Sequence, residues 1–470
     1  MSKVAVIGLD GAAPRLVFEH WRNELPNLAA LMQRGMWGEL RSCHPPITVP
    51  AWSSMLSSKD PGQLGVYGFR SRRGHAYDDY VFANATLKHP RVWDILSRAG
   101  KQSILLGVPQ TYPPPRINGC VVSCFLTPSQ ASTYTHPPGL KAEVEAVARG
   151  YVFDVEDFRT TDKHALLRRI YDKTRKHFRV ARHLLTTRPW DFFMMVEMGT
   201  DRIQHGFWRY FDRTHPKYEP RNAFKHAIRD YYRYLDDELG RLLACIDADA
   251  LVLIVSDHGA KKLKGGICFN EWLIRNGYLK LATRPEQATP ISCQLVDWAA
   301  TRAWADGGYC GRVYLNVRGR EPQGVVEPGD YEGLRDELIA AIASIEDPAG
   351  RNIGSRAFRP EELYHDTAGS PPDLIVYFGD LSWRASARVG LNMLYCSEND
   401  SGPDDANHDW NGICILREGR GDGGGKRLDG LQLMDVAPTI LRHFKLPVPP
   451  DMLGSAIDGS RTTLGVRRGG

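Results

Sequence analysis

The sequence lacks a long apolar run and a paired set of cysteines. No apolar stretch approaches the ~20 residues that span a bilayer, so we expect no membrane association. The nine cysteines are scattered, odd in number and without CxxC spacing, which argues against a disulfide framework or a structural cysteine-type zinc site. A reducing compartment fits this pattern, and because the first residues show no basic or apolar leader pattern, we expect no leader segment. We therefore expect a cytoplasmic protein.

The sequence also lacks a block of lysine and arginine, although its formal net charge is +5. No aromatic and basic stripe accompanies that charge, which suits a small anionic substrate but not a nucleic-acid polymer. No Gly/Ser-rich or Pro-rich linker and no internal repeat divides the 470 residues, so we expect a single catalytic domain over 1–470. Nothing in the sequence indicates the oligomeric state.

Short apolar runs alternate with helical patterns along the chain. Such runs are typical of strands buried on both faces, and the helices between them favour crossover connections and a largely parallel sheet. The fold class is therefore α/β. The expected strands are 4–9, 103–108, 120–125, 191–198, 251–256 and 373–378, and the clearest helical patterns are 28–34, 92–99 and 221–246.

Two regions interrupt this alternation. Residues from about 67 to 185 are rich in Tyr, Pro and Arg, and residues from about 285 to 370 contain several Gly-rich turns. We interpret both as insertions. Since ligands of open α/β sheets bind outside the carboxyl ends of the strands, insertions at that edge would shape the pocket.

Acidic and imidazole side chains follow three of the expected strands. Asp10 comes directly after 4–9, Asp201 just after 191–198, and Asp257 with His258 just after 251–256. The carboxyl ends of parallel strands meet at one edge, where such sheets place their active sites. Alone, the pair Asp257-His258 also fits a turn cap.

Two further histidines and one threonine extend this set. Asp201 and His205 are four residues apart, which places both on one helical face within reach of one ion, although a surface ion pair has the same spacing. His408 lies in a polar loop, where a solvated histidine is the alternative. Thr48 lies in the proline-rich segment 44–55 (HPPITVPAWSSM) ahead of a helical run, so its hydroxyl is either an N-cap or a group that meets a phosphate.

Together these residues offer three carboxylates, three imidazoles and one hydroxyl. Nitrogen and oxygen donors in this number suit two divalent ions and favour zinc over calcium, with manganese as the alternative metal. Two ions about 4 Å apart bind both the attacking and the leaving oxygen at phosphorus and activate a threonine nucleophile. The candidate site is Asp10, Thr48, Asp201, His205, Asp257, His258 and His408.

The ordered motifs resemble the alkaline phosphatase superfamily. The resemblance is greatest to its type I phosphodiesterase/nucleotide pyrophosphatase branch and to the bacterial predicted phosphohydrolase/phosphomutase proteins. It rests on 6–11 (VIGLDG), 48–52 (TVPAW), 256–259 (SDHG), 434–440 (MDVAPTI), the pair Asp201 and His205, and His408. It implies a three-layer α/β/α core with inserted cap regions.

The same resemblance implies roles for the site residues. One ion would be held by Asp201, His205 and His408. The other would be held by Asp10, Asp257, His258 and Thr48. Thr48 would attack phosphorus to give a phosphothreonine intermediate, which water would then hydrolyse.

One position departs from the nucleotide pyrophosphatase pattern. That pattern has an Asn three residues after the nucleophile to hold phosphoryl oxygens, whereas this chain has Ala51. The Val49 amide or a cation such as Arg72 or Lys261 is the alternative contact. The related sulfatases have an Arg where this chain has Trp52, and threonine cannot become formylglycine, so sulfatase activity is disfavoured.

We therefore expect a phosphoester hydrolase, specifically a phosphodiesterase acting on a small, nucleotide-like phosphorylated substrate. The alternatives are a phosphomonoesterase or phosphomutase with the same two-metal core, and a non-catalytic metal- or nucleotide-binding module. A dinucleotide-binding fingerprint is absent, because the turn 8–13 (GLDGAA) lacks the G-x-G-x-x-G spacing.

Overall fold

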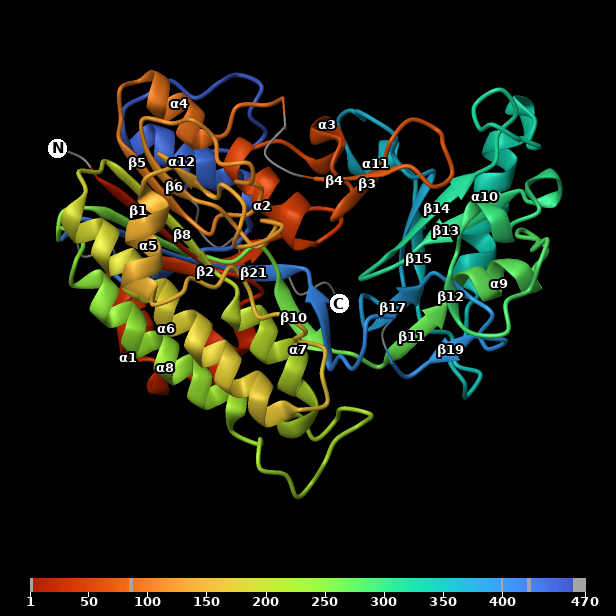
Figure 1. Ribbon diagram of the computed structural model, residues 1–470, viewed down its shortest axis with the longest axis horizontal. Coiled ribbons are helices and arrows are strands. Elements are labelled where there is room, and N and C mark those ends of the chain that lie inside the picture. Colours follow the sequence, from red (N-terminus) through yellow and green to blue (C-terminus); the bar gives the residue numbers. More distant parts are fainter. Residues whose placement is uncertain (1–2, 84–87, 399, 421–423, 460–470) are drawn as a thin grey trace, which may run out of the picture.

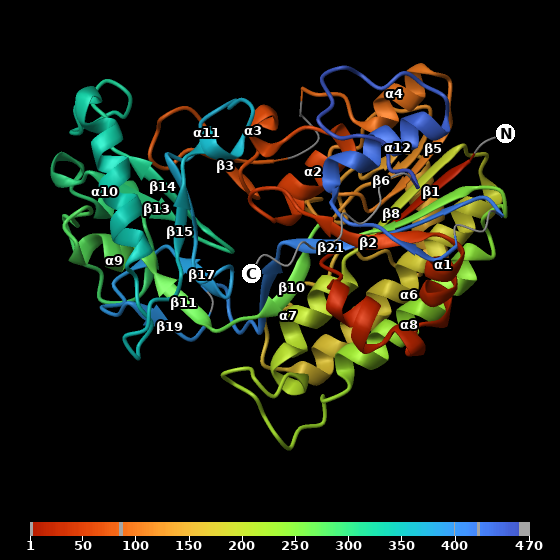
Figure 2. The same ribbon diagram turned by 180° about the vertical axis from the view of Figure 1, so that it is seen from behind.

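The chain forms a large lobe around a central sheet and a smaller lobe beside it (Figures 1 and 2). The computed structural model describes residues 3–83, 88–398, 400–420 and 424–459. Helices and strands alternate along most of the large lobe, which confirms the predicted α/β class. No helix in these described ranges is both long and apolar enough to cross a membrane.

The central sheet is parallel in its middle and has antiparallel pairings toward both ends. Its parallel strands are, in order, β9 (Leu251–Val255), β1 (Val4–Leu9), β8 (Phe192–Glu197), β5 (Ser103–Leu106) and β6 (Gly119–Val122). Antiparallel β21 (Asn411–Glu418) and β2 (Met36–Arg41) follow β9, with β22 (Lys426–Arg427) and β23 (Leu431–Gln432) beside β2 and β7 (Thr135–His136) beyond β6.

The three central strands run level with one another. Val4 of β1 lies opposite Phe192 of β8 and opposite Leu251 of β9, so all three strands end at the same edge. Every residue of the three strands is buried. Their sequences are apolar except for Glu197 at the end of β8, because a parallel sheet is covered on both faces.

Helices cover both faces of the central sheet, and successive residues of β1 pack into different cores. One layer consists of α1 (Pro26–Arg34), α5 (Leu140–Ala148), α6 (Lys163–Thr187), α7 (Gly199–Phe211) and α8 (Ala227–Leu243). The other contains α2 (Thr48–Ser57), α4 (Val92–Arg98) and α12 (Val436–His443), with the short α3 (Pro61–Leu64) following α2. The predicted three-layer core is thus present.

The smaller lobe is built on a four-stranded antiparallel sheet of order β13-β14-β16-β15. These strands are β13 (Ala303–Asp306), β14 (Gly311–Leu315), β16 (Leu374–Tyr377) and β15 (Arg356–Phe358), packed with α9 (Phe269–Arg275), α10 (Tyr331–Ala343) and α11 (Pro360–Leu363). The run 373–378 is therefore a strand as predicted, but it belongs to this second sheet and not to the central one.

Several short strands complete the smaller lobe and its junction with the large one. A three-stranded sheet contains β11 (Gly265–Cys268), β17 (Trp383–Ser386) and β19 (Tyr395–Cys396). The two-stranded pairs are β3 (Arg70–Arg72) with β4 (Tyr80–Phe82), β12 (Thr289–Pro290) with β18 (Arg388–Val389), and β10 (Gly259–Lys262) with β20 (Ala406–Asp409). Short 3-10 or π helices are Arg15–His20, Arg22–Glu24, Cys293–Leu295, Trp298–Ala300, Pro328–Asp330 and Leu433–Asp435.

The two ranges expected to be insertions differ in their placement. The range from about 67 to 185 contributes β5 and β6 to the central sheet and α6 to a covering layer. The range from about 285 to 370 lies in the smaller lobe, which also takes β11, β17 and β19 from outside that range. The description of the chain as one catalytic domain with two insertions stays a prediction.

Gly8 in β1 lets α2 approach the sheet closely. A Cβ atom at this position would overlap the Trp52 ring and lie 2.9 Å from Val196 Cγ2. We expect Gly8→Ala to lower the free energy of unfolding by about 1–3 kcal/mol, the usual cost of overpacking a core. Urea denaturation followed by fluorescence measures the change.

Gly139→Ala is the matched control, because a Cβ there meets no atom within 4 Å and its φ of −63° suits alanine. An unfolding midpoint for Gly8→Ala equal to that of this control would contradict the close packing of α2 on β1.

Candidate active site

The candidate residues lie at the carboxyl edge of the central sheet. Asp10 directly follows β1, Asp201 lies in the first turn of α7 after β8, and Asp257 and His258 follow β9. His408 comes from β20, where it pairs with Ala260 of β10. Because β10 begins directly after His258, this pairing carries a residue from far along the chain to the same edge.

The first cluster consists of Asp201, His205 and His408. His205 Nε2 lies 3.1 Å and His408 Nε2 lies 3.7 Å from the same oxygen, Asp201 Oδ1. All three residues are buried, and their ligand atoms lie within 4.8 Å of one another. Asp201 and His205 share one face of α7, as their spacing predicts.

The second cluster consists of Asp10, Asp257 and His258. His258 Nε2 lies 3.3 Å from Asp257 Oδ2 and 3.7 Å from Asp10 Oδ1. These residues are also buried and within 4.8 Å of one another. The two clusters adjoin, since the rings of His258 and His408 stack with centroids 3.6 Å apart.

Each histidine is held through Nδ1, so its Nε2 faces the cluster. His258 Nδ1 donates to the Gly259 carbonyl at 2.9 Å and His408 Nδ1 to the Pro46 carbonyl at 2.7 Å. His205 Nδ1 donates to Asp404 at 2.6 Å. A carbonyl or carboxylate on one ring nitrogen is the usual support of a metal-binding histidine.

Each carboxylate is similarly held through one oxygen. Asp10 Oδ2 accepts from Trp52 Nε1 at 2.8 Å, and Asp257 Oδ1 accepts from the Gly11 amide at 3.2 Å. Asp201 Oδ2 accepts from Arg202. The second oxygen of each carboxylate therefore faces the imidazole nitrogens.

These contacts leave buried polar atoms in both clusters without a hydrogen-bond partner among the described residues. They are Asp10 Oδ1, Asp257 Oδ2, His205 Nε2 and His408 Nε2. Burying such atoms unpaired is costly. Oxygen and nitrogen donors that converge in this way fit a divalent cation in each cluster.

Electrostatics support the same interpretation of the second cluster. Burial, followed by the charge of Asp201, raises the pKa of Asp10 to about 8. Burial and the neighbouring Asp10 raise the pKa of Asp257 well above its ordinary value, while burial lowers the pKa of His258 to about 4. Without a bound cation, the favoured state has only one of the two carboxyl groups ionised.

In the first cluster, the neighbouring His205 favours the ionised form of Asp201. Burial disfavours the ionised form of Asp201, but His205 and Arg202 outweigh it and hold its pKa below the ordinary value. Burial likewise opposes protonation of His205, yet Asp201 and Asp404 raise its pKa to about 10. A proton on His205 and a cation in this cluster would therefore compete for the same donors.

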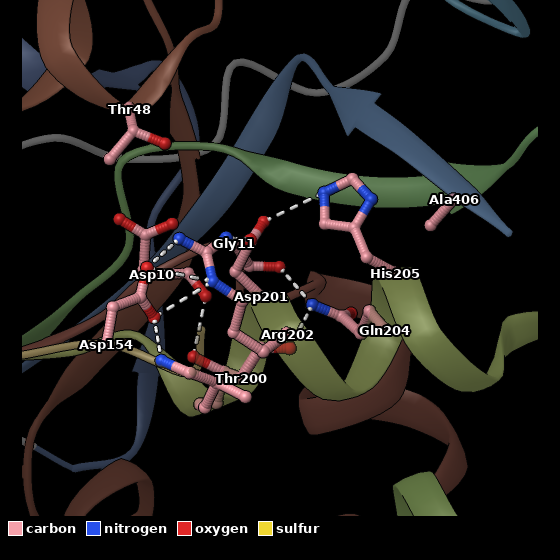
Figure 3. Close-up of polar contacts among 12 residues, drawn as sticks. Asp10, Gly11, Thr48, Asp154, Thr200, Asp201, Arg202, Gln204, His205 and Ala406 are labelled. Carbon is pink, nitrogen blue, oxygen red and sulfur yellow. Dashed lines mark hydrogen bonds and ion pairs between the residues drawn. The ribbon is translucent and has the colours of Figure 1, made fainter. Parts of the chain in front are cut away.

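Thr48 lies at the second cluster, on α2, whereas Asp201 and His205 lie on α7 (Figure 3). Its Oγ1 is 3.4 Å from His258 Nε2, and its side chain is buried. Thr48 is the first residue of α2. The N-cap residue is Ile47, and no side chain in the described part of the chain caps the helix by a hydrogen bond. The alternative prediction of an N-cap threonine is therefore wrong.

The loop after β1 is tied to α7 by side chains beneath the site (Figure 3). Thr200 Oγ1 donates to the Asp10 carbonyl at 2.6 Å, and Gln204 Nε2 donates to the Gly11 carbonyl at 2.7 Å. These bonds fix Asp10 relative to Asp201. Each donor lies directly before a ligand on α7, Thr200 before Asp201 and Gln204 before His205, but a sequence pattern does not indicate which carbonyl it meets.

Sequence reasoning missed the residues that orient the site, namely Asp404, Trp52 and Arg202. Asp404 lies four residues before His408, a spacing that hints at a shared site. Of the cations considered for the phosphoryl group, Arg72 pairs with Glu321 at 3.1 Å and Lys261 with Asp409 at 2.8 Å. Both are thus engaged elsewhere.

Comparisons with known proteins agree with the fold and the motifs. The family model described as type I phosphodiesterase / nucleotide pyrophosphatase matches residues 4–404. No curated protein sequence gives a significant match.

Two solved structures resemble the whole chain. Human ectonucleotide pyrophosphatase / phosphodiesterase 5 has a TM-score of 0.57 at 12% identity, covering 97% of each chain. Phosphonoacetate hydrolase from Sinorhizobium meliloti 1021, in complex with phosphonoacetate, has a TM-score of 0.58 at 16% identity, covering 93% of this chain and 94% of that one. At these identities the likeness shows the fold, and it confirms the predicted alkaline phosphatase-like architecture.

We expect cation binding at the second cluster to strengthen as the pH rises toward 8. The Asp10 carboxyl, with its pKa raised to about 8, must lose its proton to bind a cation, so proton and cation compete below that pH. At the first cluster, His205, with its pKa raised to about 10, adds a competition between proton and cation of the same sign. Calorimetric titration with Mn²⁺ at several pH values measures the effect.

The affinity should rise by up to about tenfold per pH unit for each proton released. Asp10→Asn removes the titrating carboxyl group and should remove its contribution to the pH dependence of the Mn²⁺ affinity. An affinity for Mn²⁺ that stays constant from about pH 6 to about pH 8 would contradict the assignment.

Proposed function

Because the chain belongs to the type I phosphodiesterase / nucleotide pyrophosphatase family of phosphoric ester hydrolases, we propose that it is a metal-dependent phosphodiesterase. Its substrate would be small, phosphorylated and nucleotide-like, and the reaction would pass through a phosphothreonine on Thr48. One observation carries the proposal: the buried Thr48 hydroxyl lies 3.4 Å from His258, at the junction of two clusters of metal-type donors.

The donor chemistry supports a pair of divalent ions. Asp201, His205 and His408 would hold one ion, and Asp10, Asp257 and His258 would hold the other together with Thr48. Three imidazoles with three carboxylates favour zinc, with manganese as the alternative. Bound there, such ions would stabilise negative charge on a phosphoryl group and favour the ionised threonine hydroxyl.

The chain's own groups then account for the covalent step. Thr48 Oγ1 forms a bond to phosphorus while the bond from phosphorus to the leaving alcohol breaks. Thr48 opens α2, and the first amides of a helix have no intrahelical acceptor, so they favour a phosphoryl oxygen. Water then breaks the Oγ1–phosphorus bond, which regenerates Thr48 and releases the monoester.

Phosphomonoesterase or phosphomutase activity is the second candidate, and Ala51 favours it. Its side chain is a buried methyl group in the first turn of α2. It supplies no amide to hold phosphoryl oxygens, unlike the Asn of the nucleotide pyrophosphatase pattern. A phosphomonoester has three free phosphoryl oxygens and a larger negative charge than a diester. It therefore depends less on such an amide contact, because bound cations would stabilise that charge.

We expect Thr48→Ala to abolish turnover while leaving the bound metal in place. The substitution removes the nucleophile but only one donor among the seven, so metal content should stay close to that of the wild type. Turnover of p-nitrophenyl esters gives the activity, and elemental analysis of the purified protein gives the metal content.

Thr48→Ser is the matched control, since it keeps a hydroxyl at the same position and should retain measurable turnover. A rate for Thr48→Ala near that of the wild type would refute the covalent role. Loss of both metal and activity in Thr48→Ala would instead assign Thr48 a structural part in the metal site.

The ester class is tested by comparing bis(p-nitrophenyl) phosphate with p-nitrophenyl phosphate. We expect a higher kcat/KM for the diester with the zinc or manganese form. The control is the chelator-treated protein, which should hydrolyse neither ester. A clear preference for the monoester would replace the phosphodiesterase proposal by the phosphomonoesterase one.

A further inference from the structure

A cavity of about 340 Å³ adjoins the candidate active site between the two lobes. Three of its lining residues also touch that site: Ile47 precedes Thr48, Arg202 donates to Asp201, and the Tyr309 ring stacks on the His408 ring at 3.6 Å. The cavity is thus next to the position at which Thr48 would attack phosphorus.

The cavity has a strongly cationic lining. Asp306 is the one acidic residue among the residues that line it. Five arginines share the lining, and they come from distant parts of the chain: Arg70, Arg159, Arg202, Arg312 and Arg384.

Two of these arginines share a single carboxylate. Arg159 Nε donates to Asp404 Oδ2 at 2.8 Å, and Arg384 Nη1 donates to the same oxygen. The other oxygen of Asp404 is occupied by His205 Nδ1 at 2.6 Å. Two guanidinium groups therefore share one carboxylate, whereas Arg312 pairs with Asp306 and Arg202 with Asp154.

Two arginines also retain unused donors. The side chains of Arg384 and Arg312 are only 8% and 9% exposed. The Nε–H group of each has no hydrogen-bond partner within the described part of the chain. Since an unpaired buried donor is costly, the described part of the chain does not fully satisfy these two guanidinium groups.

Aromatic rings hold the guanidinium groups in place. The Phe158 ring lies between Arg159 and Arg202, with each guanidinium 4.3 Å from the ring centroid. Arg384 lies 4.4 Å from the centroid of Tyr309. Stacked arginines lose less freedom when they bind, and their planar donors match an oxyanion in bidentate fashion.

We propose that this cavity binds a second oxyanion of the substrate, separate from the phosphoryl group that Thr48 attacks. This inference rests on the proposed hydrolase function. Arg384 and Arg159 are the central contacts, with Arg312 at the far wall. The oxyanion is a carboxylate or a phosphate-type group. The substrate class is accordingly a phosphoester with an additional anionic group, which a neutral ester does not match.

The wild-type protein tests this directly with paired probes. Bis(4-carboxyphenyl) phosphate and bis(4-carbamoylphenyl) phosphate have nearly the same shape, but only the first has carboxylates on both arms. The corresponding monoesters cover the alternative ester class, and 4-phosphonophenyl phosphate separates a phosphate-type group from a carboxylate. The carbamoyl group withdraws electrons more strongly than the carboxylate, so the carbamoyl probe is intrinsically the more reactive one. A higher kcat/KM for the carboxylate probe therefore reports binding of the carboxylate.

We expect kcat/KM for the carboxylate probe to exceed that for the carbamoyl probe by about 10- to 100-fold, the range of a charge-assisted hydrogen bond. Arg384→Gln should reduce this ratio toward one. Arg318→Gln is the matched control, because Arg318 is an exposed arginine of the smaller lobe that pairs with Glu327, and it should leave the ratio unchanged.

The ratio of the two kcat/KM values distinguishes an arginine that binds the oxyanion from one that only positions the site. Arg384 also contacts Asp404, which holds His205, so a merely structural role would lower both rates equally and keep the ratio. That outcome would overturn the proposal, as would a wild-type ratio near one. Arg312→Gln, which leaves Asp404 untouched, provides the second variant.

A binding measurement keeps the inference independent of turnover. Calorimetric titration of the wild-type protein with 4-carboxyphenylphosphonate and 4-carbamoylphenylphosphonate should give at least tenfold tighter binding of the carboxylate. If no ester is hydrolysed but this difference is observed, the hydrolase proposal fails and the oxyanion site stands. If esters are hydrolysed and both phosphonates bind equally, the oxyanion site fails alone.

Discussion

Three buried carboxylates, Asp10, Asp201 and Asp257, meet at the carboxyl edge of the central sheet, and their mutual repulsion is the constraint around which the site is built. Burial raises the pKa of Asp10 to about 8 and that of Asp257 well above its ordinary value. Folding brings these groups together because β1, β8 and β9 are level with one another. The hydrophobic burial of the sheet therefore supports a charged arrangement that would be unfavourable alone.

The surrounding residues direct that charge. Trp52, Gly11 and Arg202 each satisfy one oxygen of a carboxylate and leave the other turned toward an imidazole nitrogen. Carbonyl and carboxylate acceptors orient the three histidines in the same way. The donors converge on two adjacent points, and Thr48 is supplied from the other helical layer. The arginine-lined cavity lies beside them between the two lobes, and we propose that a second oxyanion of the substrate binds there.

Much of this arrangement could be predicted from local sequence. Apolar runs marked the strands, and acidic residues at their ends marked the edge where the clusters lie. The run 373–378 was a strand but belonged to the second sheet, because an apolar run does not reveal its pairing partner. Asp404 and Trp52 were missed for a related reason: their roles depend on contacts with distant residues. The arginine cavity was equally hidden, since its walls combine residues as far apart as Arg159 and Arg384.

Anomalous diffraction from crystals grown with zinc tests the central claim most directly, because it locates each cation without relying on turnover. The account predicts two anomalous peaks, one bounded by Asp201, His205 and His408 and the other bounded by Asp10, Asp257 and His258, with Thr48 Oγ1 next to the second. Crystals that show zinc at neither cluster, at a concentration sufficient to saturate the protein in solution, would contradict it.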